Sequence, residues 1–226
     1  MGLGMKKPTW SFSAIKLFEQ CPRKYYHLKI KKDFKDEQNE AAMYGEMFHE
    51  AAEFYVSDQA ELPPQFEFAR RSLDKLKALP GEKLTEYKMG LTEELEACAM
   101  DDPKVWWRGI ADLSIINGTK AKVLDYKAGA SAKYADTDQL ELMALATFKH
   151  FPDVEEVDAA LFFVIAKAFI RREYKRSDAP ALWAKWLQRY GRILTAIESG
   201  VWNPKTSGLC KKYCVVLTCP HNGRNM

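Results

Sequence analysis

The spacing of apolar residues changes along the chain, and this change predicts the order of helices and strands. In the first 80 residues apolar side chains recur every three or four positions, which is the helical period. The spacing predicts helices over about 11–32, 39–56 and 64–79. Cys21-Pro22 should interrupt the first of these, because proline cannot continue a helix.

After Pro80-Gly81 the apolar residues fall into short segments instead. This change of period predicts three strands, over 84–91, 105–116 and 121–127. Asn117-Gly118, between the second and third segments, is a strong signal for a hairpin turn. We therefore expect the three strands to form an antiparallel meander.

The last part of the chain returns to mixed patterns. They predict a helix over about 136–150, strands over 157–166 and 168–174, and a long helix from Ser177 to Gly200. The fold class that follows is α/β, with a mixed central β-sheet flanked by helices. We expect one domain over 11–226, preceded by a flexible tail over 1–10.

Charge narrows the range of partners. The 226 residues include 34 basic and 31 acidic side chains, a net charge of +3, which excludes a globally cationic packaging protein. Contact with nucleic acid must then be local, although each basic patch is equally consistent with an ordinary solvated face. The candidate patches are Lys29–Lys32, Arg70-Arg71, Arg171-Arg172 with Lys175-Arg176, and Lys211-Lys212. There is no apolar run of the roughly 20 residues that span a bilayer, so no membrane contact is expected.

Two acids and a lysine on the predicted hairpin suggest a metal site. Asp125 and Lys127 alternate with core positions, so both should lie on one face of their strand. Asp112 lies on the preceding strand and can approach them across the turn. Carboxylates bind hard cations such as Mg²⁺ or Mn²⁺, and a nearby lysine can orient an attacking water. This set suits the hydrolysis of phosphodiester bonds.

Three further residues extend this candidate site. His49 lies one turn beyond Gly45 on a predicted helix and can add an imidazole ligand. Glu86, on the strand before, can hydrogen-bond a metal ligand or water, and Gln139, early in the next helix, can hold a phosphate or the lysine. Several of the candidate residues also have an ordinary explanation when taken singly: His49 as a core or surface histidine, Asp125 and Lys127 as a chance Asp-x-Lys, and Gln139 as a surface residue of a helix.

The order of these motifs resembles the RecB-type branch of the PD-(D/E)XK nuclease superfamily. The chain has Gly-x-x-x-His-Glu on a helix, a strand Glu, then Gly-x-x-Asp, Asp-x-Lys and a helix opening with Gln-Leu. The resemblance implies a restriction-endonuclease-like core. It also implies that His49, Asp112 and Asp125 bind the metal, that Lys127 is catalytic, and that Gln139 belongs to the motif after it.

The same resemblance implies a function. We expect a DNA exonuclease acting on single strands or duplex ends, in recombination, repair or phage DNA processing. Its expected location is the cytoplasm of a bacterium or of a phage-infected host cell. The alternative is a catalytically silent nucleic-acid-binding or scaffolding module with a structural zinc or iron–sulfur site.

Cysteines gather near the two ends of the chain. Cys210, Cys214 and Cys219 are close in sequence, and Cys21 lies in a Cys-Pro-Arg motif near the start. This layout is similar to the RecB-type nucleases that hold a [4Fe-4S] cluster, such as the AddB subunit and the CRISPR adaptation nucleases. Such a cluster requires four thiolates, and it would join the terminal segments. A zinc site that includes His221, or four free thiols, are the alternatives.

Overall fold

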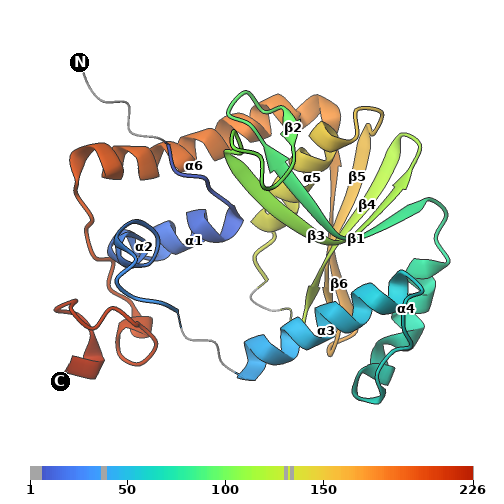
Figure 1. Ribbon diagram of the computed structural model, residues 1–226, viewed down its shortest axis with the longest axis horizontal. Helices are drawn as coiled ribbons and strands as arrows, with labels where there is room; N and C mark the ends of the chain where they lie inside the picture. Colours follow the sequence, from blue (N-terminus) through green and yellow to red (C-terminus); the bar gives the residue numbers. More distant parts are fainter. Residues whose placement is uncertain (1–6, 37–39, 130–131, 133–134, 226) are drawn as a thin grey trace. The chain divides into compact units, whose positions relative to one another are not determined.

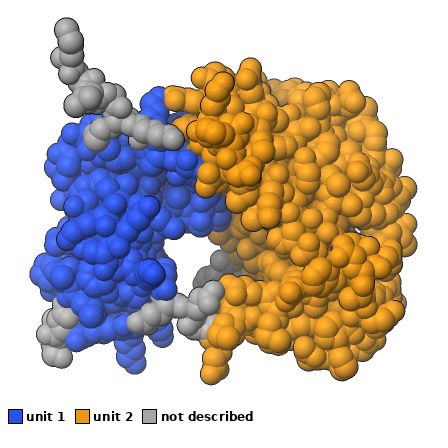
Figure 2. All heavy atoms as spheres, in the orientation of Figure 1, with its two compact units in different colours: residues 1–38, 184–226 blue, residues 39–183 orange. Residues whose placement is uncertain are grey.

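A computed structural model describes residues 7–36, 40–129, 132 and 135–225. The chain divides into two compact units. The first combines Met1–Gln38 with Ala184–Met226, and the second is the middle segment Asn39–Trp183 (Figure 2). The second unit contains the whole β-sheet, and the first contains the paired terminal segments.

The sheet of the second unit has six strands in the order β2-β1-β3-β4-β5-β6 (Figure 1). Only β4 and β5 pair in parallel, so the sheet is mixed, as predicted. The first three predicted strands form the expected antiparallel meander of β1, β3 and β4. The strands are β1 (Glu82–Leu91), β2 (Ala97–Cys98), β3 (Trp107–Asn117), β4 (Lys120–Lys127), β5 (Glu156–Phe163) and β6 (Ala168–Lys175).

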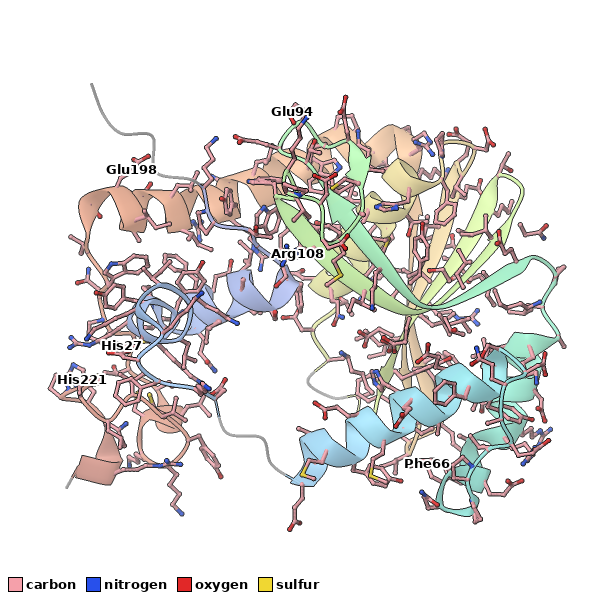
Figure 3. All side chains as sticks on the ribbon, in the orientation of Figure 1. His27, Phe66, Glu94, Arg108, Glu198 and His221 are labelled. Atoms are coloured by element: carbon pink, nitrogen blue, oxygen red, sulfur yellow. The ribbon has the colours of Figure 1, made fainter. Side chains whose placement is uncertain are left out.

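Helices cover both faces of this sheet. The buried side of α3 (Glu40–Val56) packs with α4 (Arg70–Lys77) against one face, which presents Leu124 and Tyr126. The ring of Phe66, labelled in Figure 3, meets Phe48 of α3 edge to face at 5.3 Å. The other helix, α5 (Asp138–His150), is the crossover between the parallel strands β4 and β5, and residues 140–148 are buried along its whole circumference.

Arg176 is part of a predicted basic patch, but the fold uses it for support. Its guanidinium donates hydrogen bonds to the carbonyls of Phe148, in the last turn of α5, and of Phe151 and Val154, in the loop that follows the helix. Arg176 is therefore partly engaged within the fold, and the contact of this patch with nucleic acid stays a prediction. Its neighbours Arg171, Arg172 and Lys175 are exposed.

The first unit is built from short helices and most of a long one. It contains α1 (Phe12–Gln20), α2 (Pro22–Tyr25), a π-helix (Tyr26–Lys31) and part of α6 (Ala179–Ser199). Ser11 caps α1 by accepting a hydrogen bond from a backbone N–H of its first turn. Residues 1–6 of the predicted tail lie outside the described residues, whereas Trp10 is 1% exposed and stacks on Trp186 and Tyr190.

Several boundaries differ from the predicted ones. The predicted helix 64–79 is a 3-10 helix (Pro64–Ala69) followed by α4, and the predicted strand 157–166 ends at Phe163 because 164–167 form the turn into β6. The short strand β2 had no sequence signal. Among the described residues, no helix has the length and apolar character that crossing a membrane requires.

Candidate active site

Helix α3 carries His49 to the end of the β3–β4 hairpin. Phe48, Ala51 and Ala52 fix the helix against the sheet, and His49 lies at the edge of that buried stripe. Nε2 of His49 lies 3.1 Å from the carbonyl oxygen of Tyr126. A carbonyl can only accept, so the bond requires a proton on Nε2. In the neutral ring this leaves the lone pair on Nδ1 for a ligand.

Asp112 lies where the pairing between β3 and β4 stops. The last paired residues at this end are Leu113 and Leu124. One step further, Oδ2 of Asp112 accepts the backbone N–H of Tyr126 at 2.5 Å, so a side chain replaces the next rung of the ladder. The other oxygen, Oδ1, lies 3.4 Å from Nδ1 of His49. The carboxylate is thus fixed by one oxygen and presents the other to the histidine.

Glu86 reaches the same point through an unusual backbone conformation. Its neighbours Thr85 and Tyr87 pair with Leu113 and Ala111, which places Glu86 opposite Asp112, but no pair forms there. The φ angle of Glu86 is +46°, in the left-handed region that non-glycine residues rarely adopt. Such conformations occur often at functional sites, where the surrounding structure maintains them.

His49, Glu86 and Asp112 form a group suited to a cation. Their ligand atoms all lie within 4.8 Å of one another. The donor set is one imidazole nitrogen and two carboxylates, which suits Mn²⁺ and Mg²⁺. The fold fixes the position of each side chain: His49 lies on a packed helix, Asp112 at the end of the β3–β4 pairing, and Glu86 at a strained position of β1.

Asp125, Lys127 and Gln139 form a second group beside the first. Nζ of Lys127 lies 2.6 Å from Oδ2 of Asp125 and 3.1 Å from Oε1 of Gln139. The amide of Gln139 donates to the other oxygen of Asp125, which closes the triangle. The register of β3 and β4 places Asp125 opposite Asp112. The lysine is therefore held next to the carboxylate cluster, with about a third of its side chain exposed.

The electrostatics show an excess of negative charge in the absence of a cation. Burial and then the charge of Asp112 raise the pKa of Asp125 to about 6, against the opposing effect of Lys127. Burial, again with Asp112, raises the pKa of Glu86. Burial lowers the pKa of His49, but its hydrogen bond to Asp112 and the charges of Asp112 and Asp125 outweigh this and raise it overall. A bound cation would relieve this repulsion.

The structure brings all six predicted site residues into one region but groups them differently. The resemblance implies that His49, Asp112 and Asp125 bind the metal, and the strand position of Glu86 predicts a hydrogen bond to a metal ligand or water. In the structure Glu86 completes the cation group, and Asp125 is bound to Lys127 and Gln139. The position of Glu86 opposite Asp112 is what places it in the cation group, and it can be predicted only if the register between β1 and β3 is known.

The four predicted cysteine ligands lie in the first unit and line one cavity of about 180 Å³. His221, labelled in Figure 3, also lines it. Sγ of Cys21 lies 3.4 and 3.5 Å from the backbone nitrogens of Lys24 and Lys205, and Sγ of Cys210 lies 3.4 Å from that of Ser207. Across the described part of the chain, His49, Glu86 and Asp112 are the group whose ligand atoms lie within 4.8 Å of one another, so no three cysteine sulfurs are that close together.

Comparisons with known proteins agree with this architecture. Residues 9–220 match the family model described as the PD-(D/E)XK nuclease superfamily. A structure named as a candidate exonuclease of Eubacterium rectale aligns with a TM-score of 0.52 and 15% identity, over 90% of this chain and 86% of that one. A protein named SSO0001 aligns with a TM-score of 0.49 and 14% identity, over 98% and 90%. The comparison with curated proteins finds no match.

Proposed function

Because the chain belongs to the PD-(D/E)XK nuclease superfamily, we propose that it is a metal-dependent nuclease that hydrolyses phosphodiester bonds of DNA at the site on β1, β3, β4, α3 and α5. The observation that carries this proposal is a cation group that lies beside a hydrogen-bonded triangle of Asp125, Lys127 and Gln139. Hydrolysis of a phosphodiester needs both parts: the cation neutralises charge on the phosphate, and the lysine orients the attacking water.

His49, Glu86 and Asp112 would hold the cation, and Asp125 is the adjacent carboxylate that can join them. The donor set fits the metal, because the tautomer of His49 leaves Nδ1 available and the carboxylates repel one another without a cation. Mg²⁺ or Mn²⁺ bound there supplies a Lewis acid that neutralises charge on the phosphate. The imidazole favours Mn²⁺ slightly over Mg²⁺.

Lys127 orients the attacking water or the phosphate. Its ammonium is fixed by Asp125 and by Gln139, so it can donate a hydrogen bond to an attacking water or to the negatively charged phosphate oxygens without reorganising. The water oxygen forms the new bond to phosphorus as the P–O bond to the leaving nucleotide breaks; the water gives up one proton and the leaving oxygen takes one up, exchanged through solvent. Gln139 acts as a positioning residue, since it bonds both the lysine and the carboxylate.

We assign exonuclease action on single strands or duplex ends as the mode of cleavage. The motif order of the RecB-type branch supports this assignment, and the name of the E. rectale structure agrees with it. Recombination, repair or phage DNA processing, inside a bacterial or phage-infected cell, would use such an enzyme. The competing function is a silent DNA-binding module.

Incubation with labelled DNA separates these functions. Oligonucleotides labelled at either end, with Mn²⁺, Mg²⁺, Ca²⁺ or EDTA, should be cut with the first two ions and left intact with EDTA. Ca²⁺ should support cleavage poorly, because its coordination is larger and looser. Binding without cutting would favour the silent module, and full cleavage in EDTA would refute the metal mechanism.

We further propose that Cys21, Cys210, Cys214 and Cys219 hold a [4Fe-4S] cluster in the first unit. Support comes from the shared cavity and from the backbone N–H groups directed at Cys21 and Cys210, which stabilise thiolate charge. When bound, the cluster would fasten the two terminal segments together. A structural zinc held by three cysteines and His221 is the alternative.

Elemental analysis of anaerobically purified protein decides between these metals. The cluster predicts brown protein with about four irons per chain, and colour lost in Cys21→Ser. One zinc without iron, even after anaerobic reconstitution, would replace the cluster with a zinc site. No metal would leave the cysteines as free thiols.

A further inference from the structure

A row of aromatic rings runs from the candidate active site to the outermost strand of the sheet. The ring of His49 meets Tyr126 at 5.8 Å, Tyr126 meets Phe162 at 6.1 Å, and Phe162 stacks on Phe169 at 4.3 Å with an interplanar angle of 4°. Phe162 and Phe169 are direct cross-strand partners of β5 and β6. The row therefore ends at Phe169, on the strand with no further neighbour in the described sheet.

Phe169 is exposed although it is large and apolar. One side of its ring covers Phe162, yet 39% of the residue remains accessible to solvent. The guanidinium of Arg171 lies 5.7 Å from the ring centroid. Arg171 lies over this exposed ring, and a nucleobase can stack there when the guanidinium turns toward its phosphate.

The charge around Phe169 suits a polyanion. Residues 167–175 contain Lys167, Arg171, Arg172 and Lys175 against Glu173, a local net charge of +3 in nine residues. All four basic side chains are exposed, whereas Arg176 is engaged with the end of α5. This positive charge favours an anionic partner such as nucleic acid over a basic peptide.

The β5–β6 turn lies at the same end of the sheet as the candidate catalytic lysine. Lys127 pairs with Phe163, and the backbone N–H of Val164 donates to the carbonyl of Lys127 at 3.0 Å. The turn 164–167 then leads directly to Phe169. Phe169 pairs with Phe162 on the sheet face that carries Tyr126, whereas Lys127 faces the other side, so a strand with a phosphate at Lys127 reaches Phe169 by passing around this end of the sheet.

We propose that Phe169 and Arg171 form a base-stacking site for an unpaired nucleotide of the substrate strand, at the end of the sheet that carries the candidate active site. The proposal rests on the proposed nuclease function for its substrate class. The ring supplies the stacking surface and Arg171 the phosphate contact. Both residues position the strand, and neither takes part in bond breaking.

Binding of a fluorescent single-stranded oligonucleotide in Ca²⁺ tests this site. Phe169→Leu keeps apolar contact with Phe162 but removes the aromatic face, and it should weaken binding about five-fold or more. Phe169→Trp should restore binding. Arg171→Ala should weaken binding and reduce its dependence on salt. The charge-matched control is Lys120→Ala, at the other end of β4 and roughly 23 Å from Lys127.

Abasic substitution makes the test specific. Removing one base at a time from the oligonucleotide should reveal one position where wild-type binding falls and Phe169→Leu binding does not fall further. Wild-type hydrolysis of bis(p-nitrophenyl) phosphate with Mn²⁺ tests the nuclease function separately, because this diester carries no nucleobase. Equal binding by wild type and a folded Phe169→Leu variant, or a flat abasic scan, would overturn the stacking site whether or not the diester is hydrolysed.

Discussion

The left-handed backbone of Glu86 predicts that replacing this residue with glycine relieves strain while it removes a ligand of the cation. An L-residue in this conformation costs roughly 1–2 kcal/mol, and glycine avoids that cost. Glycine also gives the unfolded chain more freedom, which costs roughly 0.5–1 kcal/mol. Glu86→Gly should therefore be more stable than Glu86→Gln by roughly 0.5–1 kcal/mol. Both variants remove the same carboxylate charge beside Asp112.

Urea unfolding in EDTA measures this difference without the metal. Because Glu86→Gln keeps the side-chain length and the positive φ angle, the comparison isolates the backbone. In thermal unfolding, the same free-energy difference should separate the melting temperatures of Glu86→Gly and Glu86→Gln by about 2 °C in a chain of this size. Mn²⁺ at 100 times its Kd should stabilise the wild type by about 2.7 kcal/mol, and both variants should lose most of this gain.

Two results would refute this reasoning. If Glu86→Gly is less stable than Glu86→Gln in EDTA, the backbone of Glu86 stores no strain. If either variant keeps the Mn²⁺ stabilisation of the wild type, Glu86 is not a ligand of the cation. The two outcomes are independent, so each tests a separate part of the argument.

Further substitutions test the second group and the cysteines. Asp125→Asn and Lys127→Met should each reduce the cleavage rate about 100-fold or more, with unchanged circular dichroism; near-wild-type cleavage by either would remove it from the mechanism. Gln139→Ala should reduce the rate about 10- to 100-fold, because it only positions the other two; a larger loss would give it a direct role. Cys21→Ser should lower the melting temperature of metal-loaded protein, whereas Cys98→Ser should leave it unchanged.

The chemistry-bearing positions of the sheet could be predicted because they depend on local signals. Asn117-Gly118 defines the β3–β4 hairpin, and the alternation around Asp125 and Lys127 gives their shared face. Gln139 follows β4 closely in the chain, so its position at the start of α5 is also a local property.

The sequence could not reveal features that depend on pairing between distant segments. The replacement of a ladder rung by the Asp112 carboxylate requires knowing where β3 and β4 diverge. Glu86 enters the cation group only through its register with β3 and a positive φ angle, which no composition rule predicts for glutamate. Trp10 looked like part of a tail because its stacking partners, Trp186 and Tyr190, lie more than 170 positions away.

Anomalous diffraction can locate a Mn²⁺ ion at the group formed by His49, Glu86 and Asp112. Crystals of the Lys127→Met protein soaked in Mn²⁺ would keep His49, Glu86 and Asp112 and prevent turnover. We expect an anomalous peak within bonding distance of Nδ1 of His49 and of the carboxylates of Glu86 and Asp112. Ordered side chains in a saturated crystal without a peak there, or a peak elsewhere, would contradict it.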